Sequence, residues 1–476
     1  MTFQPEKRKV INTLICPGVR NRQGNWGRCI VMMFSTRDLK RLIWPLVVEQ
    51  LLAVTIGMMD TMMVAGCGEA AVSGVSLVDS INVLLINIFS ALATGGAIVA
   101  SQYLGRNDLK NANLAARQLL LAVGILSTVL GALALAGNHG ILNLMFGTAD
   151  EDVMQNSYTY FFWSALSYPF LGIYNGGAAL FRAMGNSKVS MRTSILMNVV
   201  NISGNAILIY GANLGVAGAA IATLVSRILG AVIMVYLLHS KPHVEDKIHL
   251  QSLNIFQWNW SMIKKILNIG IPNGLENGMF QVGKVLVQGL VSTFGTAAIA
   301  ANAAAGSVCS LPQIPSTAIG LAMVTVIGQC VGAGDYEQAK KYTKKLTLLS
   351  CLCMLVLSLI EMACALPLTR LYNLSGEATT MAVEVIIANG IFSILIWPIS
   401  FTLPNGLRAA GDVRFTMISS VLSMWIFRIA FSYLLAQGLQ MGLMGVWGAM
   451  FIDWFVRASL FTWRFFSNKW RGKAIR

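Results

Sequence analysis

Long apolar stretches, separated by short polar segments, dominate this chain of 476 residues. An α-helix needs roughly 20 apolar residues to cross a bilayer, and twelve stretches reach that length. They lie at about 43–64, 77–104, 115–137, 156–182, 190–210, 214–238, 264–291, 303–331, 343–366, 380–407, 414–436 and 441–465. Because backbone groups in hydrocarbon must hydrogen-bond within their own segment, each stretch is expected to be a helix. The pattern therefore predicts an all-α membrane protein with twelve transmembrane helices.

The second half of the chain repeats the first half. With a shift of 227 residues, Glu49 corresponds to Glu276, and a Gln-x-x-Gly-x-x-Asp motif at 102–108 corresponds to 329–335. Six helices in each half return the chain to the side where it began, so the halves are parallel repeats, as in many transporters. We therefore predict two six-helix pseudo-symmetric lobes. The predicted division is a disordered cytoplasmic tail at 1–36, an N-lobe at 37–238, a cytoplasmic inter-lobe linker at 239–263, a C-lobe at 264–466 and a basic cytoplasmic tail at 467–476.

Composition and charge agree with a protein embedded in a membrane. Hydrophobic residues make up 55% of the chain and charged residues 12%, whereas soluble domains carry about 25% charged residues. The Lys and Arg residues collect in the tails and in the loops on one side of the predicted membrane, which marks that side as cytoplasmic. We expect a multi-pass protein of the cell membrane with both termini in the cytoplasm. Because the net charge of +15 comes from short loops and tails, it does not indicate a nucleic-acid partner.

The first predicted helix carries two acids inside an apolar stretch. Glu49 and Asp60 are eleven residues apart, a spacing that places them on nearly one helix face and about 16 Å apart along the axis. A carboxylate in hydrocarbon is costly, so it usually faces a bundle interior or a water-filled cavity. One interpretation is an ion path with acids at two depths. The other is a structural pair held by polar neighbours.

Several motifs, in order along the chain, resemble the multidrug and toxic compound extrusion (MATE) family of cation-coupled antiporters. The motifs are Asp60-Thr-Met-Met-Val with Gly68, Gln102-Tyr-Leu-Gly105, Arg182-Ala-Met-Gly185-Asn186, and Gly215-Val-Ala-Gly218 running on to Thr223. The resemblance covers about 38–463, nearly the whole chain. It implies two lobes that form a V around a cavity. It also implies export of organic, often cationic, compounds in exchange for Na⁺ or H⁺.

The resemblance further implies a cation site in the first lobe. By position, the site falls on an acid of helix 1, two amides of helix 5 and a hydroxyl of helix 6, which are Asp60, Asn201, Asn205 and Thr223. These side chains offer oxygen atoms, which hard cations such as Na⁺ prefer as ligands. Asp60 is the single carboxylate expected in this cluster. The alternative is that the amides only hydrogen-bond neighbouring helices. The sequence leaves Na⁺ and H⁺ both open as the coupling ion and indicates no other metal or cofactor.

Helix 7 carries a second group of polar positions. Gln281, Lys284 and Gln288 follow the i, i+3, i+7 spacing of one helix face. Glu276 lies on the same helix, and Asn198 continues the amide stripe of helix 5. We interpret these five residues as candidates for the substrate cavity. A buried ion pair with a neighbouring helix is the alternative for Lys284.

The repeat also suggests contacts that gate the transport path. Glu49, Gln102 and Gln329 are the gate candidates, because they lie near the predicted cytoplasmic ends of their helices at repeat-related positions. Plain solvated helix ends are the alternative for Glu49 and its repeat mate Glu276.

The favoured function is a secondary-active exporter of multiple drugs or organic cations, working by antiport against Na⁺ or H⁺ and alternating access of the two lobes. The sequence has no phosphate-binding loop, nucleophile–base arrangement or zinc motif, so neither an enzyme nor an ATP-driven pump is expected. We expect small organic substrates, cationic or amphiphilic, and a monomeric protein. Two alternatives stay open. One is a lipid-linked saccharide flippase of the same superfamily, which would need a more basic cavity; the other is a non-transporting membrane scaffold or sensor.

Overall fold

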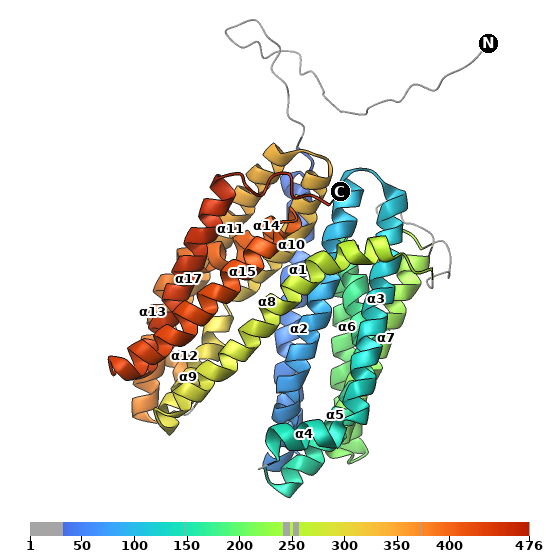
Figure 1. Ribbon diagram of the computed structural model, residues 1–476. Helices are drawn as coiled ribbons and strands as arrows, with labels where there is room; N and C mark the ends of the chain where they lie inside the picture. The colour runs from blue at the N-terminus through green and yellow to red at the C-terminus, as the bar shows by residue number, and fades with distance from the viewer. Residues whose placement is uncertain (1–31, 148, 241–247, 251–256, 373, 476) are drawn as a thin grey trace, which may run out of the picture.

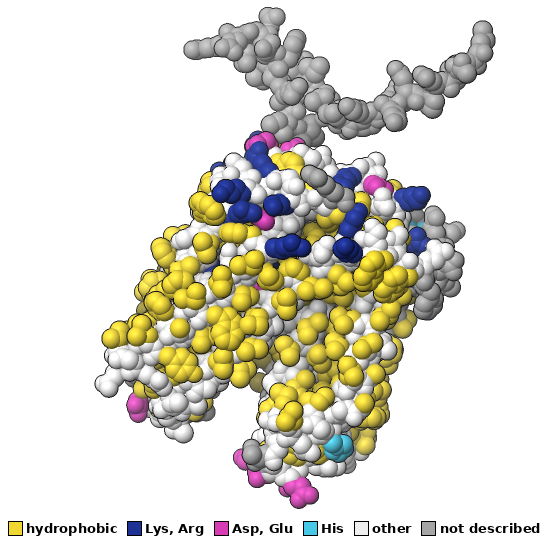
Figure 2. Space-filling view, in the orientation of Figure 1, with side chains coloured by type: hydrophobic (Ala, Val, Ile, Leu, Met, Phe, Trp, Pro, Cys, Tyr) yellow, Lys and Arg dark blue, Asp and Glu magenta, His cyan; other side chains and the backbone are white. Residues whose placement is uncertain are grey.

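The computed structural model describes residues 32–147, 149–240, 248–250, 257–372 and 374–475. Within these ranges the secondary structure is helical, without strands. Two helical bundles meet near the start of α1 and the end of α17 and diverge toward the opposite end, so the molecule is shaped like a V (Figure 1). The gap between the two arms remains open when side chains are drawn as spheres (Figure 2).

Six long helices build the N-lobe, and each follows one predicted stretch. They are α1 (Thr36–Ala65), α2 (Glu69–Gly105), α3 (Leu109–Ala136), α5 (Glu151–Ala183), α6 (Ser187–Asn205) continued by the π-helical η1 (Ala206–Gly211), and α7 (Gly215–His239). The short α4 (Asn138–Phe146) lies at the tip of this arm (Figure 1). Helix α2 begins well ahead of the predicted stretch at 77–104, because its first turns carry polar residues that an apolar window leaves out.

The C-lobe repeats this plan with more interruptions. Its elements are α8 (Trp260–Ser292), α9 (Thr296–Ser310), α10 (Gln313–Gly332), α11 (Tyr336–Ala363), α12 (Ala365–Arg370), α13 (Gly376–Trp397), η2 (Pro398–Thr402), α14 (Leu403–Ala409), α15 (Val413–Ser423), η3 (Met424–Ala430), α16 (Phe431–Tyr433), η4 (Leu434–Gly438) and α17 (Gly442–Phe466). Pro312 lies between α9 and α10, and Pro398 opens η2, since proline lacks the N–H that a continuous helix needs. With α9–α10, α13–α14 and α15–η4 each counted as one span, the predicted twelve-helix, two-lobe membrane fold is confirmed.

Ten spans in the described part of the chain are long and apolar enough to cross a bilayer by composition alone. Helices α5 and α8, each 33 residues long, complete the twelve; polar side chains interrupt both. The domain limits at 238 and 264 stay predictions, although α7 ends at His239 and α8 begins at Trp260. The expected disorder of the N-terminal tail and most of the linker fall outside the described residues.

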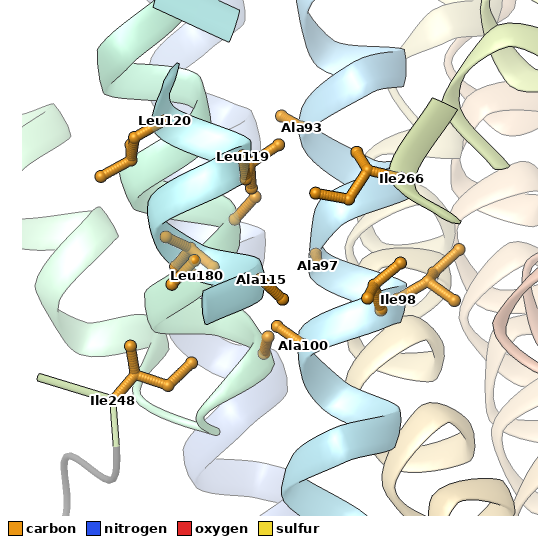
Figure 3. Close-up of a cluster of buried hydrophobic side chains, with 14 of the residues drawn as sticks. Ala93, Ala97, Ile98, Ala100, Ala115, Leu119, Leu120, Leu180, Ile248 and Ile266 are labelled. Carbon is orange, nitrogen blue, oxygen red and sulfur yellow. The ribbon is translucent and has the colours of Figure 1, made fainter. Parts of the chain in front are cut away.

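Small residues let the core helices of both lobes approach closely. Ala100 of α2 faces Ala115 of α3, Ala93 of α2 lies next to Leu119 of α3, and Ile266 of α8 lies on the other side of α2 (Figure 3). Helix α2 accordingly packs against α3 and α5 of its own lobe and against α8 and α10 of the C-lobe. Close approach of this kind is how helices associate where the surrounding lipid is as apolar as their side chains.

Candidate functional site

A chain of hydrogen bonds joins the four predicted cation-site residues across α1, α6 and α7. The amide of Asn205 donates to Asp60 (Nδ2–Oδ1 2.6 Å) and makes a longer bond to the amide oxygen of Asn201 (3.4 Å). Asn201 in turn donates to the hydroxyl of Thr223 (3.0 Å). Asn201 and Asn205 are 1% and 0% exposed. The structure therefore brings residues from three helices of the N-lobe together, with the two asparagines buried and Asp60 and Thr223 half-buried.

Two buried amide oxygens on α6 are unpaired. The Oδ1 atoms of Asn198 and Asn205 have no hydrogen-bond partner among the described residues. Asn198 does not join the chain above, because its amide donates to the carbonyl of Ser194 one turn earlier (2.8 Å). Buried polar atoms in native proteins are nearly always paired, so an unpaired oxygen beside a carboxylate requires an explanation. A bound cation would supply one, since oxygen is the ligand that hard cations prefer.

A second carboxylate, missed in the sequence analysis, lies beside this chain. Asp79 of α2 accepts hydrogen bonds from Asn82 (Nδ2–Oδ1 3.1 Å) and from Tyr160 of α5. Its charge interacts with that of Asp60, and Arg227 of α7 attracts both acids. The expectation of a single carboxylate in the cluster is thus corrected. The signal was present, because Asp79 is an acid inside a predicted span, the property that singled out Asp60.

The repeat-related glutamates are ion-paired within their own lobes. Arg182 of α5 donates to Glu49 of α1 at 2.9 Å, and Arg408 of α14 donates to Glu276 of α8 at 2.5 Å. Arg457 of α17 adds a third charge, 3.7 Å from Glu276. Glu49 and Glu276 are 7% and 6% exposed, so neither is a solvated helix end. The same acid–arginine bond therefore braces the equivalent helices of each lobe.

Two glutamines bridge the lobes at the end of the molecule where the two bundles meet. Gln102 of α2 donates to the carbonyl of Ala409 in the C-lobe (2.8 Å). Gln329 of α10 donates to the carbonyl of Ala183 in the N-lobe (2.8 Å). Because the two glutamines are repeat mates, the bonds are reciprocal. We call this contact between the ends of α2 and α10 the seam.

Glycines make the seam possible. A Cβ added to Gly105 would lie 2.0 Å from the carbonyl oxygen of Gln329, and one added to Gly332 would lie 2.0 Å from that of Gln102. Any side chain at either position would therefore meet the backbone of the opposite lobe. The Asp that ends each Gln-x-x-Gly-x-x-Asp motif caps the following helix, α3 or α11, with its side chain. The motif thus combines lobe contact, close approach and a helix start in seven residues.

The C-terminal tail also crosses the seam. The backbone amide of Ile475 donates to the side chain of Gln102 (2.9 Å), and Arg106 donates to the carbonyl of Ile475. Earlier in the tail, Trp470 is 2% exposed, and Arg471 pairs with Glu337 of α11 at 2.7 Å. A segment anchored on the C-lobe therefore reaches onto the N-lobe.

A cavity of about 390 Å³ lies inside the C-lobe, between α8, α9, α13, η3 and α17. Lys284 and Gln288 of the predicted stripe are part of its lining, whereas Gln281 and Glu276 are not among the described lining residues. Gln288 accepts a hydrogen bond from Asn302 (2.9 Å). Much of the remaining wall is aromatic, formed by Phe280, Trp397, Phe401, Trp447 and Trp454. We refer to this space as the C-lobe cavity.

The internal repeat of the chain agrees with a comparison against known families. A family model described as MatE matches residues 45–207 and, again, residues 272–434. The chain belongs to the MatE family. The two matched ranges are offset by 227 residues, the shift at which the sequence repeats itself. The resemblance inferred from the motifs is confirmed, and the family is one of transporters.

Relatives match the chain over almost their full lengths. The uncharacterized transporter YisQ of Bacillus subtilis is 26% identical, covering 93% of this chain and 96% of its own. The probable multidrug resistance protein NorM of Thermotoga maritima is 25% identical, covering 92% and 94%. Among solved structures, an outward-facing multidrug resistance MATE family transporter superposes with a TM-score of 0.84 at 20% identity, covering 91% of this chain and 96% of that one. MATE in complex with MaL6 gives 0.85 at 20% identity, covering 91% and 97%. This MatE protein therefore has the fold of a multi-pass membrane transporter.

Proposed function

We propose that the protein is a secondary-active exporter of small organic compounds, driven by a cation that binds in the N-lobe. The observation that carries the proposal is the hydrogen-bonded chain from Asp60 through Asn205 and Asn201 to Thr223 within one arm of the V. Relatives named as probable multidrug resistance proteins support small drug-like molecules as the transported class. The exchange would be antiport, with Na⁺ or H⁺ entering as substrate leaves.

Charge balance at the N-lobe cluster supports a monovalent coupling ion. When both are ionised, Asp60 and Asp79 bring two negative charges, and Arg227 brings one positive charge. The arginine keeps its charge at all physiological pH values. The cluster is therefore one positive charge short of neutrality, which a single Na⁺ or H⁺ would supply. Na⁺ would have the unpaired oxygen of Asn205 as a ligand beside the carboxylate.

The helices that hold the cluster give the ion a way to act on the lobes. A ligand shifts a conformational equilibrium only if it binds one state better than the other. Asp60 belongs to α1, which packs against α6 of its own lobe and also against α10 of the C-lobe. A cation that draws Asp60 toward Asn205 and Thr223 would change how α1 contacts the opposite lobe. Ion binding would in this way favour one arrangement of the V.

We infer that the end of the molecule that contains the seam faces the cytoplasm. Lys and Arg side chains gather over that end of the molecule, and a band of hydrophobic side chains follows it toward the arms (Figure 2). Positive residues are enriched on the cytoplasmic side of membrane proteins. In this orientation the seam closes the cytoplasmic end, and the arms open outward. We propose a monomer as the working unit, because one chain contains both lobes and both halves of the seam.

The test is dye efflux from proteoliposomes or cells under separately imposed Na⁺ and pH gradients, with a fluorescent cation and a fluorescent anion as substrates. We expect Asp60→Asn to lower gradient-driven efflux at least tenfold for whichever dye the wild type exports. Glu69→Gln is the matched control, since Glu69 is an exposed acid at the start of α2. Undiminished, gradient-coupled efflux in Asp60→Asn would overturn the assignment of this site.

A further inference from the structure

Two positive side chains face the C-lobe cavity. Lys284 of α8 and Arg428 of η3 are the charged residues in its described lining, which contains no acid. Both cations lie over the ring of Phe280, with Lys284 Nζ 5.3 Å and Arg428 Cζ 5.0 Å from the ring centroid. Within the described residues, neither forms an ion pair. Charges inside membrane segments usually pair or face a functional cavity, and these two face a cavity.

Arg428 is buried without the partners that a guanidinium normally has. It is 9% exposed, its Nη2 atom contacts the sulfur of Met450 at 3.2 Å, and its Nε atom has no hydrogen-bond partner in the described structure. Trp454 is also in the lining, and its buried indole N–H has no hydrogen-bond partner in the described structure either. A buried charge without a partner is costly, and a guanidinium matches a planar oxyanion with two parallel hydrogen bonds. The cavity thus presents donors that lack an acceptor.

The nearest acids stand behind the lining rather than in it. Asp453 of α17 is 0% exposed and accepts a hydrogen bond from Ser423 at 2.6 Å, although its charge still attracts Arg428. Glu361 of α11 is 4% exposed and lies behind Cys309. Asp453 therefore offsets part of the positive charge of the buried Arg428. The surface that a ligand would meet remains positive.

The walls and the size of the cavity suit an aromatic ligand. Trp397 and Phe401 stack with ring centroids 4.9 Å apart, and Trp454 meets Phe401 edge-on at 6.0 Å. Aromatic faces of this kind bind flat apolar rings through offset or edge contacts. The volume of about 390 Å³ falls in the range of pockets for drug-sized molecules.

We propose that the C-lobe cavity binds an aromatic organic anion, with its carboxylate or sulfonate between Lys284 and Arg428 and its ring against the aromatic wall. The inference rests on the proposed transport function, because it takes this cavity as the substrate site. It narrows the expected cationic or amphiphilic substrates to acidic amphiphiles, since an organic cation would be repelled here. It also separates the two ligands by charge. The coupling cation meets acids in the N-lobe, and the substrate meets bases in the C-lobe.

Binding to the purified full-length protein tests the proposal directly. The probes are 2-naphthoate, neutral 2-naphthamide and a naphthylmethyl-trimethylammonium cation, followed by isothermal titration calorimetry. We expect the wild type to bind the carboxylate at least tenfold more tightly than the amide or the cation. Lys284→Gln should remove most of that preference, whereas Lys284→Arg should keep it. Lys264→Gln, an exposed lysine on the same helix, is the control and should bind like wild type.

A second variant and a transport measurement keep the outcome decisive. Arg428→Lys keeps the positive charge but loses the two parallel N–H donors of the guanidinium, so it should weaken the binding of 2-naphthoate. A cooperative melting transition would show that this variant is still folded. Equal affinities of the wild type for the three probes would overturn the proposal. An unchanged affinity for 2-naphthoate in both Lys284→Gln and Arg428→Lys would also overturn it. In the efflux assay, export of the cation without the anion would also overturn it and would leave the proposed exporter intact. Charge-selective, Lys284-dependent binding without efflux of any dye would support the cavity and refute the exporter.

Discussion

The seam offers the sharpest perturbation of the proposed alternating access. Gly105→Ala adds one methyl group at the contact between the ends of α2 and α10. That methyl would lie 2.0 Å from the carbonyl oxygen of Gln329, whereas real Cβ atoms essentially never approach another heavy atom closer than 3.0 Å. The two lobes must therefore separate locally by at least 1.0 Å, the difference between these two distances. The obstacle is backbone, so a side-chain rotation cannot relieve it.

The size of the expected shift follows from the fact that the added methyl group strains only the arrangement in which the seam is closed. Overpacking by a methylene-sized group costs typically 1–3 kcal/mol. The cost falls on the arrangement in which the seam is closed and disappears once the lobes separate there. We therefore expect Gly105→Ala to shift the equilibrium by roughly 5- to 150-fold toward the arrangement with an open seam and closer arm tips. Gly332→Ala should act in the same direction, because its added Cβ meets the reciprocal backbone oxygen at the same distance.

Distances between the two arm tips report this shift. Leu144 in α4 and Leu371 after α12 are 89% and 76% exposed, so spin labels on cysteines there would not disturb packing. In a background with the native cysteines replaced, double electron–electron resonance on reconstituted protein should show the population with shorter tip distances rising. Gly278→Ala on α8 is the matched control, because its added Cβ would meet nothing within 4 Å. Identical distance distributions in Gly105→Ala and Gly278→Ala would refute the reasoning.

Two further perturbations test other parts of the fold. Glu276→Gln leaves the half-buried Arg408 and the buried Arg457 without their acid, so we expect a stability loss of about 3–5 kcal/mol, seen as a lower melting temperature in detergent. Glu49→Gln unpairs one arginine that is more exposed and should lose less; an equal or larger loss would contradict this ranking. Deleting 469–476 removes buried Trp470 and the bond from Ile475 to the N-lobe, and should bring the labelled arm tips closer. Unchanged tip distances after this deletion would show that the tail does not hold the seam.

Much of the fold could be predicted because membrane helices are determined locally. Each span must satisfy its own backbone, so the length of an apolar stretch is enough to place it. The repeat added the two-lobe plan, and it drew attention to Gln102 and Gln329, which the structure places at the seam. The errors were at helix ends. Helix α2 extends beyond its apolar part at Glu69, because a helix can continue into the membrane interface with polar side chains.

The candidate site was only partly predictable. The resemblance named Asp60, Asn201 and their neighbours, which do meet in space. Asp79 was overlooked, although a systematic search for acids inside predicted spans would have found it. Arg428 stood out in the sequence only as a charge inside a predicted span, whereas its place at a cavity whose described lining contains no acid is a property of the tertiary structure.

The helices of this protein are determined locally, whereas the contacts between its charged side chains are determined by tertiary packing. The sequence alone determined the twelve helices, the two lobes and the presence of costly charges inside spans, because hydrophobic length and repetition are properties of consecutive residues. Only the tertiary structure decided which charges meet. It paired Glu49 with Arg182, set Asp79 beside Asp60, and left Lys284 and Arg428 facing an open cavity. Those outcomes depend on how each helix is rotated and packed, and they can join residues more than a hundred positions apart in the chain, such as Glu49 and Arg182.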